Sequence, residues 1–528
     1  MIKPCVLLLS LGLSGVAVAQ SATDLDMANK IRQESFHHSQ VMKTLSHLTE
    51  VIGPRLTVSP QKYAANDWTA KQFKAWGLSH VHKEAFADFG RGWEFTNATV
   101  QEIAPRKMPL RALPKAWSPG THGTVEGEVM KVSIESVDDL KKYKGKLAGK
   151  ILLLDDAREY ERSDEPDSQR YGAAELAKLH DFEIPGDRKG RKDWTKRYAK
   201  YLKLRKARTK FFAEEGVLAT ISVSNRSDGI IGVSGNGTRK AGEPVGVPAL
   251  VMMSEHYNEL VRDIENKRPV KLRINVDAHF TSDKNLPGYN VIAEIPGHGR
   301  HADEIVMLGA HMDSWHAGTG ASDNGAGVAV MMEAMRILKA VGAKPDRTIR
   351  VALWGGEEQG LIGSQAYVKQ HFAAYPEPTD PEQKKLPDWL RKPSGKLQFK
   401  PEYKRLSAYF NLDNGSGRIR GIYAQENVAV MPIFKQWLKP FHDVGATEVV
   451  SGNTGSTDHI SFDRVGLPGF QFVQDWLDYF PHVHHTNLDT LDHVSAEDLK
   501  QAAAVVAWFA YKAATRQDKL PRKPLLED

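Results

Sequence analysis

The feature that most constrains the fold is an alternation of short apolar runs with helical patterns after about residue 275. The runs of strand length are residues 305–308, 349–353, 408–412 and 469–472. The segments with helical periodicity between and after them are residues 326–340, 359–370, 431–438 and 496–511. Strands that alternate with helices are typical of an α/β layer. We therefore expect an α/β fold with a mixed, largely parallel sheet flanked by helices.

Local signals predict a helix and a strand-rich unit that precede this layer in the chain. Ser59 and Pro60 provide a cap and a first-turn proline, and the apolar stripe that follows predicts an amphipathic helix over residues 60–76. From about residue 120, short strand candidates lie between glycine-rich turns. Residues 120–275 are therefore expected to form a separate, strand-rich unit, and a chain of 528 residues is long enough for both units.

The N-terminus has the three parts of a secretory signal peptide. Lys3 precedes an apolar run over residues 6–13, and the small residues 17–19 precede Gln20. Cleavage after Ala19 is predicted, with a buried N-terminal helix as the alternative. Because no later run reaches the roughly 18 apolar residues of a membrane span, we expect a secreted or periplasmic protein without a membrane span.

Cysteine usage and charge limit the chemistry. Cys5 is the single cysteine and lies inside the predicted signal peptide, so the mature protein has neither a disulfide nor a catalytic thiol. Any metal site must therefore use His, Asp and Glu. The formal net charge of +6 suits solubility and does not by itself indicate a nucleic-acid partner.

Two charged insertions interrupt this frame. Residues 187–210 carry twelve Lys or Arg and two acidic residues, which suggests either a nucleic-acid surface or, as the favoured interpretation, a solvated helical excursion. Residues 376–401 hold six prolines among many charges, which is typical of an extended surface loop. Neither segment carries an obvious chemistry.

Acidic and histidine side chains follow the predicted strands in five short segments, at the strand ends where open α/β sheets build their sites. The segments are residues 311–313, 322–325, 357–358, 413–414 and 484–490. A pair of hydrolytic divalent cations needs one carboxylate between both ions, a histidine and a carboxylate on each, and a water between them. These five segments offer that set.

The spacing within the segments suggests roles. Asp313 lies two residues after His311, where its carboxylate is expected to accept the second ring N–H. Asp323 begins a turn of small residues that lets a carboxylate approach two cations. Glu357 and Glu358 are neighbours, so their side chains diverge; one can bind a metal while the other acts as general base.

These motifs resemble the co-catalytic zinc exopeptidases, which include leucyl aminopeptidases, aminopeptidase Y, glutamate carboxypeptidase II and carboxypeptidase Q. The resemblance rests on residues 310–314, 321–327, 354–360 and 485–490, and extends to residues 52–55. It implies the zinc-exopeptidase, phosphorylase/hydrolase-like fold, with a discontinuous peptidase domain over residues 20–119 and 276–515. Residues 120–275 resemble an inserted protease-associated domain, and residues 516–528 are left as a C-terminal tail.

Carried over position by position, the resemblance implies two zinc ions, with cobalt or manganese as other candidate metals. It implies that His311 and Asp413 bind one ion, Glu358 and His485 the other, and Asp323 both. Glu357 becomes the general base. The family also has a cis peptide bond after its bridging aspartate, which falls at Asp323–Asn324.

Further positions have weaker counterparts. Asp458 and His459 resemble the Ser-Asp-His segment of the family, except that Thr457 replaces the usual serine. His484, before the implied ligand His485, resembles the carboxypeptidase Q branch; contact with the oxyanion and a packing role are both open.

The predicted function is an exported zinc-dependent exopeptidase that hydrolyses a peptide or dipeptide through a bridging metal-bound water. Aminopeptidase or dipeptidase action is the leading hypothesis, and carboxypeptidase action is the alternative; a glutaminyl cyclase and a non-catalytic binding protein are outside alternatives. An acidic residue would bind the free α-amine that an aminopeptidase recognises, and an arginine would bind the terminal carboxylate that a carboxypeptidase recognises. The acids weighed for the first role are Glu333, Asp458, Asp475 and Asp478, and the arginines weighed for the second are Arg418, Arg420 and Arg464. No nucleic-acid partner is expected, and a dimer is compatible with the sequence.

Overall fold

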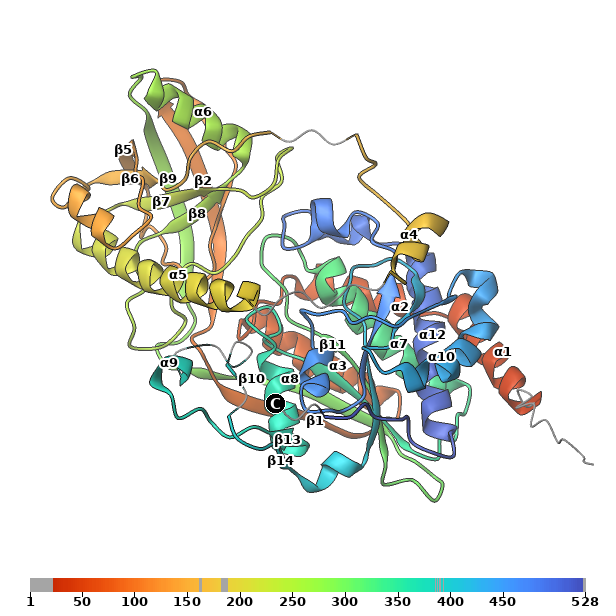
Figure 1. Cartoon of the computed structure of the whole chain (residues 1–528). Helices are drawn as coiled ribbons and strands as arrows, with labels where there is room; N and C mark the ends of the chain where they lie inside the picture. Colours follow the sequence, from red (N-terminus) through yellow and green to blue (C-terminus); the bar gives the residue numbers. More distant parts are fainter. Residues whose placement is uncertain are drawn as a thin grey trace, which may run out of the picture.

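The computed structural model describes residues 22–160, 164–181, 189–384 and 394–525, together with Leu386, Asp388, Arg391 and Lys392. The predicted signal peptide over residues 1–19 lies outside the described residues. Two eight-stranded sheets organise the described chain (Figure 1). Within the described ranges, none of the helices has the length and apolarity that crossing a membrane requires.

The first sheet has the strand order β1-β10-β12-β11-β15-β18-β16-β17. Its strands are β1 (Ser79–Gly90), β10 (Leu286–Ile295), β11 (Ile305–His311), β12 (Thr348–Trp354), β15 (Leu406–Asn411), β16 (Ile419–Tyr423), β17 (Glu448–Val450) and β18 (Gly469–Gln474). The four central strands run parallel, whereas β1 and β10 pair antiparallel at one side. This confirms the mixed α/β class.

Helices cover both faces of this sheet. They are α1 (Ala22–His37), α2 (Val41–Ser46), α3 (Pro60–Ala75), α7 (Ala326–Ala340), α8 (Ile362–His371), α10 (Met431–Leu438), α11 (His459–Asp463) and α12 (Ala496–Thr515). On one face, α7 and α12 pack against each other, and Phe410, Phe472 and Phe509 join the sheet to them. On the other face, α8 and α11 cover Trp354 and Tyr409. The central strands are therefore buried on both faces, as their continuous apolar runs predict.

Capping signals set the starts of two of these helices. The Ser59 side chain accepts a main-chain N–H of the first turn of α3 at 3.1 Å, with proline at the first position. This confirms the helix that the sequence predicted over residues 60–76. Ser495 likewise accepts the N–H of Asp498 at 3.4 Å at the start of α12.

The second sheet has the strand order β3-β2-β9-β5-β6-β7-β8-β4. Its strands are β2 (Trp93–Ala104), β3 (Met108–Leu110), β4 (Ala112–Pro114), β5 (Val125–Lys131), β6 (Lys150–Leu153), β7 (Ala219–Val223), β8 (Ala249–Met252) and β9 (Lys271–Phe280). The expected boundary at residue 120 does not coincide with this sheet, because β2, β3 and β4 precede it and pair within it. The helices that accompany this sheet in the chain are α4 (Ala173–Lys178), α5 (Lys189–Glu214) and α6 (Ser254–Glu265).

The two insertions take different forms. The described part of residues 187–210 lies in α5, which runs along the side of the second sheet nearest the first sheet (Figure 1). The described residues of 376–401 contain the short elements α9 (Pro381–Lys384) and β14 (Gln398–Phe399), and a 3₁₀ turn over Pro401–Lys404 begins at the last of them. β14 pairs with β13 (Ala373–Ala374).

A half-buried ion-pair cluster joins α8 to the edge of the first sheet. His371, the last residue of α8, lies 3.0 Å from Glu84 on β1 and 3.9 Å from Glu402. Burial by itself lowers the pKa of His371, but the neighbouring carboxylates of Glu402 and Glu84 outweigh it and raise the pKa to about 9. The protonated ring therefore stabilises the folded state.

This cluster predicts a pH-dependent contribution to stability. Because the folded pKa lies above the ordinary value of 6.5, the contribution is complete below about pH 6.5 and is lost as the pH rises to about 9. We expect His371→Gln to lower the free energy of unfolding by about 1–2 kcal/mol at pH 6 and by almost nothing at pH 9.5. The value at pH 6 allows for the partial exposure of the cluster. Urea unfolding at both pH values measures it. The exposed His442→Gln serves as control, and an equal loss at both pH values would contradict the assignment.

Candidate metal centre

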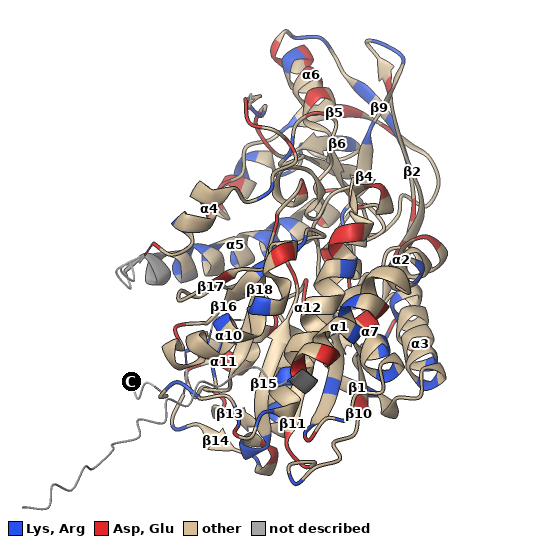
Figure 2. Ribbon diagram, turned by 90° about the vertical axis from the view of Figure 1, so that its right-hand side faces the viewer, with Lys and Arg blue, Asp and Glu red and all other residues tan. Residues whose placement is uncertain are grey.

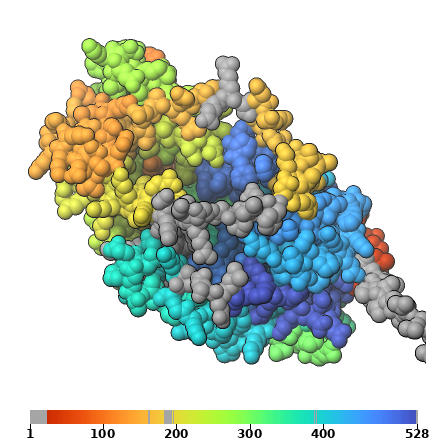
Figure 3. Space-filling view, in the orientation of Figure 1, coloured from red at the N-terminus to blue at the C-terminus, as the bar shows by residue number. Residues whose placement is uncertain are grey.

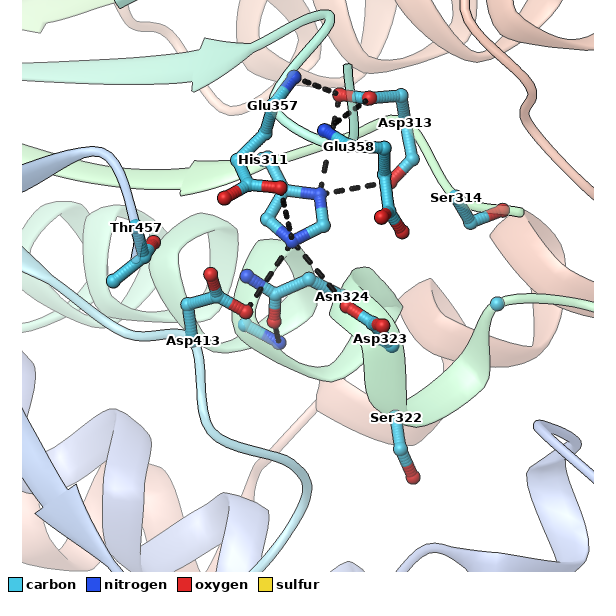
Figure 4. A network of polar contacts seen from close by, with 12 residues as sticks. His311, Asp313, Ser314, Ser322, Asp323, Asn324, Glu357, Glu358, Asp413 and Thr457 are labelled. Carbon is cyan, nitrogen blue, oxygen red and sulfur yellow. Dashed lines mark hydrogen bonds and ion pairs between the residues drawn. The ribbon is translucent and has the colours of Figure 1, made fainter. Parts of the chain in front are cut away.

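The predicted site residues converge where parallel strands end. His311 ends β11, Glu357 follows β12, and Asp413 follows β15. Because these strands are parallel neighbours, their carboxyl ends lie on one edge of the sheet, and Figure 4 shows the three side chains facing a common point. Asp323 reaches this point from the turn before α7.

The carboxylate of Asp323 lies between two histidines. Its Oδ1 is 3.4 Å from Nε2 of His311, and its Oδ2 is 3.3 Å from Nε2 of His485. Each histidine has a second carboxylate: Asp413 Oδ1 is 3.2 Å from His311 Nε2, and Glu358 Oε2 is 2.9 Å from His485 Nε2. The five side chains thus form two groups that share Asp323.

Two sets of three donors have all their ligand atoms within 4.8 Å of one another. One comprises His311, Asp323 and Asp413, and the other comprises Asp323, His484 and His485. The rings of His484 and His485 stack with centroids 3.7 Å apart, and His484 Nε2 lies 3.9 Å from Asp323. The structure therefore brings His484 to the site beside the implied ligand.

His311 and the carboxylates of this centre are buried, whereas the His485 side chain is 35% exposed, and the charges are incompletely matched. Asp323 Oδ2 and Glu358 Oε1 have no hydrogen-bond partner among the described residues. Burial, together with the neighbouring carboxylates, raises the pKa of Glu358. Asp323 is buried too, but His311 and His485 hold its pKa below the usual range. Burying unpaired carboxylates is costly, and histidine with carboxylate is a donor set that zinc accepts, so these residues fit divalent cations.

Asp313 plays a different part from the one expected. The Nδ1 atom of His311 hydrogen-bonds the main-chain carbonyl of Asp313 at 2.9 Å, whereas the nearest carboxylate oxygen is 3.9 Å away. The carboxylate instead accepts the main-chain N–H groups of Glu357 and Glu358 at 3.3 and 3.2 Å, and the hydroxyl of Thr57 at 2.9 Å. Asp313 therefore fixes the turn that carries both glutamates (Figure 4).

The turn that carries Asp323 needs small residues. Gly320 has a φ of +68°, and a Cβ there would lie 2.4 Å from the Ser314 side chain. A Cβ on Gly327 would lie 2.2 Å from the side chain of Asn324 and 2.5 Å from the Leu412 carbonyl. The missing side chains let the start of α7 approach the strand ends. The Asp323–Asn324 peptide bond is cis, as the resemblance implies.

Two supporting residues were not assigned from the sequence. The buried Arg55 donates to the carbonyls of Met312 at 2.8 Å and Gly320 at 2.7 Å, which ties the end of β11 to the Asp323 turn. Asp489 accepts the N–H groups of Ser322 at 2.6 Å and Asp323 at 3.3 Å. Both lie inside motifs that the resemblance covers, which was the available signal.

The remaining predicted residues lie farther from the ligands. His459 Nε2 hydrogen-bonds the carbonyl of Thr454 at 2.9 Å, and burial lowers its pKa to about 4. Neither carboxylate oxygen of the buried Asp458 has a hydrogen-bond partner among the described residues, and burial raises the pKa of Asp458 to about 7. Neither residue belongs to the two donor sets.

A cleft of about 2550 Å³ opens above the centre. Glu357, Glu358 and Asp413 are in its floor, and both sheets contribute to its walls. In the space-filling view, the yellow atoms of α5 lie directly above the teal atoms of the chain near residue 380 (Figure 3). The centre is thus reached through a cleft between the two sheet units.

The residues weighed for substrate polarity are mostly engaged elsewhere. Glu333 pairs with Arg336 at 2.8 Å, Asp475 with Arg420 at 3.0 Å, and Asp478 with His493 at 2.5 Å. Arg418 lies 3.3 Å from Asp498. Of the seven residues weighed, Arg464 alone is among the described residues that line the cleft.

This fold and this centre define a metal-dependent hydrolase. Residues 290–510 match peptidase family M28. Carboxypeptidase Q of Mus musculus is 25% identical over 535 aligned positions, which cover 98% of this chain and 97% of that protein. The chain is therefore a metallo-exopeptidase, and its residues 290–510 carry the likeness to peptidase family M28.

Solved structures agree with this assignment. A peptidase M28 precursor from Shewanella amazonensis SB2B superposes with a TM-score of 0.64 and 26% identity, covering 95% of this chain and 99% of that chain. The zinc aminopeptidase BSAP from Bacillus subtilis superposes with a TM-score of 0.53 and 21% identity, covering 90% and 95%. The superposition with BSAP supports the fold of this chain alone.

The contacts of Asp489 predict an effect on metal affinity. Asp489→Ala removes the acceptor that orients the turn of Asp323, so we expect zinc to bind about 10–100-fold more weakly, as for other outer partners of metal ligands. Competition with a zinc chelator measures the affinity. The exposed Asp492→Ala is the matched control, and unchanged affinity in Asp489→Ala would refute the positioning role.

Proposed function

We propose that this chain is a two-zinc exopeptidase that hydrolyses terminal peptide bonds of short peptides. The ligands would be His311 and Asp413 on one ion, Glu358 and His485 on the other, and Asp323 on both. The observation that carries this proposal is the placement of the two Asp323 oxygens, 3.4 and 3.3 Å from different histidines. The zinc aminopeptidase BSAP, whose fold this chain shares, supports zinc as the metal.

When bound, two zinc ions would polarise the scissile carbonyl and make a water acidic at neutral pH. Glu357 has the position of the general base, because its side chain is in the floor of the cleft and its Oε2 lies 4.0 Å from His311. Its carboxylate accepts a proton from the attacking water and then donates that proton to the departing amine nitrogen. Asp313 holds the main chain of Glu357, so the carboxylate stays aimed at the cleft.

The adjacent glutamates divide their tasks. Both main-chain N–H groups are held by the one carboxylate of Asp313, and the two side chains then diverge. Glu358 turns to His485, 2.9 Å away, while Glu357 turns to the side of His311. A ligand and a base can therefore stand on consecutive residues without competing for one position.

The polarity that the cleft supports best is recognition of a C-terminal carboxylate, as in a carboxypeptidase. Carboxypeptidase Q matches this chain over almost its whole length. Of the four acids weighed as amine partners, none is among the described residues that line the cleft. Aminopeptidase action remains the competing prediction, since BSAP, which is named a zinc aminopeptidase, shares the fold. We also propose export, on the predicted signal peptide.

The proposed base predicts a separation of metal binding from turnover. Glu357→Ala should keep two zinc ions and lose at least about 10²-fold in kcat, the low end for general base catalysis. Zinc content by atomic absorption and turnover of a dipeptide measure the two effects. Glu358→Ala is the contrasting variant, because it should lose zinc as well. Near-normal turnover of Glu357→Ala would remove the residue from the mechanism.

The polarity predicts a pattern across blocked peptides. The zinc-loaded enzyme should cleave N-acetylated peptides and fail on C-amidated ones, compared with the free peptide. Chromatography of the products measures each rate. The reverse pattern, with amidated but not acetylated peptides cleaved, would establish an aminopeptidase instead.

A further inference from the structure

The two insertions without an assigned chemistry form opposite walls of the cleft. From α5, Tyr198, Tyr201, Leu202 and Arg205 line it. Their spacing of three or four residues places them on one face of the helix. From the proline-rich segment, Lys384 and Lys392 line the cleft. The favoured interpretation of residues 187–210 as a solvated excursion therefore describes only part of α5.

The charges that line the cleft are sharply divided. The acids among the described lining residues are Asp323, Glu357, Glu358 and Asp413, all assigned to the metal centre. The cations come from the walls: Lys196, Arg205 and Arg239 on one side, and Lys384, Lys392 and Arg464 on the other. Arg391 also lines the cleft but pairs with Glu377 and Asp388. With two dications in the floor, the cleft as a whole attracts anions.

Arg239 is the most constrained of these cations. Its Nε donates to the carbonyl of Phe89 at 2.9 Å, and its guanidinium lies over the Phe89 ring at 4.2 Å. Burial, followed by the positive charge of Arg205, lowers the pKa of Arg239 to about 10, so the group stays charged at neutral pH. Arg205 lies over the Tyr201 ring at 5.7 Å, and no acidic side chain is within ion-pair distance of either arginine in the described part of the chain. A half-buried guanidinium in this state gains from a carboxylate, which it can bind through two parallel hydrogen bonds.

We propose that α5, residues 234–239 and the proline-rich segment form a carboxylate-binding wall, so that the enzyme prefers short anionic peptides. The proposal rests on the proposed exopeptidase function and names its substrate class. The cleft volume of about 2550 Å³ exceeds that of a typical small-molecule pocket, so residues beyond the scissile bond have room to meet the wall. Figure 2 shows Lys and Arg side by side along α5.

The test uses four peptides of one length. Two differ by Glu or Gln at one position distant from the scissile bond, and each is made with a free or an amidated C-terminus. We expect kcat/KM to be at least about 10-fold higher for Glu than for Gln, mainly through KM, and the preference to shrink in 0.5 M NaCl because salt screens the attraction. Because amidation is expected to block hydrolysis, the amidated pair is compared by binding to zinc-loaded Glu357→Ala, where it distinguishes a side-chain carboxylate from a terminal one. Equal kcat/KM for the Glu and Gln peptides with free C-termini would overturn the proposal.

Variants assign the preference to the wall. Arg205→Gln and Arg239→Gln should each reduce the Glu-over-Gln ratio at least about threefold, through a higher KM for the Glu peptide. Lys206→Gln is the matched control, because it removes one positive charge from an exposed position of α5 outside the cleft lining. Arg239 also packs on Phe89, so Arg205→Gln keeps the test valid if Arg239→Gln unfolds. If the Glu-over-Gln ratio is unchanged in the double variant Arg205→Gln, Lys196→Gln, the proposed carboxylate-binding wall is wrong.

A binding measurement separates this proposal from the proposed function. Zinc-loaded Glu357→Ala is titrated with the Glu and Gln peptides by calorimetry, which needs no turnover. Tighter binding of the Glu peptide, lost in the Arg205→Gln background, supports the wall even if the wild type hydrolyses neither peptide. Equal affinities overturn the wall even if hydrolysis is observed.

Discussion

The crowding of buried carboxylates at one sheet edge is the constraint on which the catalytic unit depends. Asp323 and Glu358 each leave an oxygen without a hydrogen bond among the described residues. Arg55 lies among these acids, but its donors are engaged by main-chain carbonyls. An uncompensated buried carboxylate costs several kcal/mol even after relaxation, so cations from solution would stabilise this edge. Metal binding and local folding are therefore coupled at this point.

The main chain supplies the rigidity that such a site needs. Strands β11, β12 and β15 are parallel neighbours, so three functional side chains start from one line of strand ends. Arg55 and Asp489 then fix the turn of Asp323 from two sides, and Asp313 fixes the turn of the two glutamates. Most of these supporting contacts are made with main-chain groups, which position a loop without restricting its side chains.

Local pattern predicted the parts of this structure that depend on local interactions. The apolar runs gave β11, β12, β15 and β18, and Ser59 with Pro60 located α3. The strand partner of β2 was not predictable, because pairing with β9 joins residues about 180 positions apart and leaves no local trace. The partner of His311 Nδ1 was also missed: the sequence identifies Asp313, but the carbonyl and the carboxylate of one residue are equally near in the chain.

The face of α5 illustrates the same limit and its consequence. The sequence predicted the charge and the helical character of α5. The direction in which Tyr201 and Arg205 point could not be predicted, because it depends on how the two sheets pack. The packing places positive charge above a floor of buried acids. These opposite signs are compatible because the acids would hold cations at contact distance, whereas the charges of the wall act through solvent that screens them within about 10 Å. Such a wall leaves metal binding largely intact, yet it acts on any anionic peptide already inside the cleft.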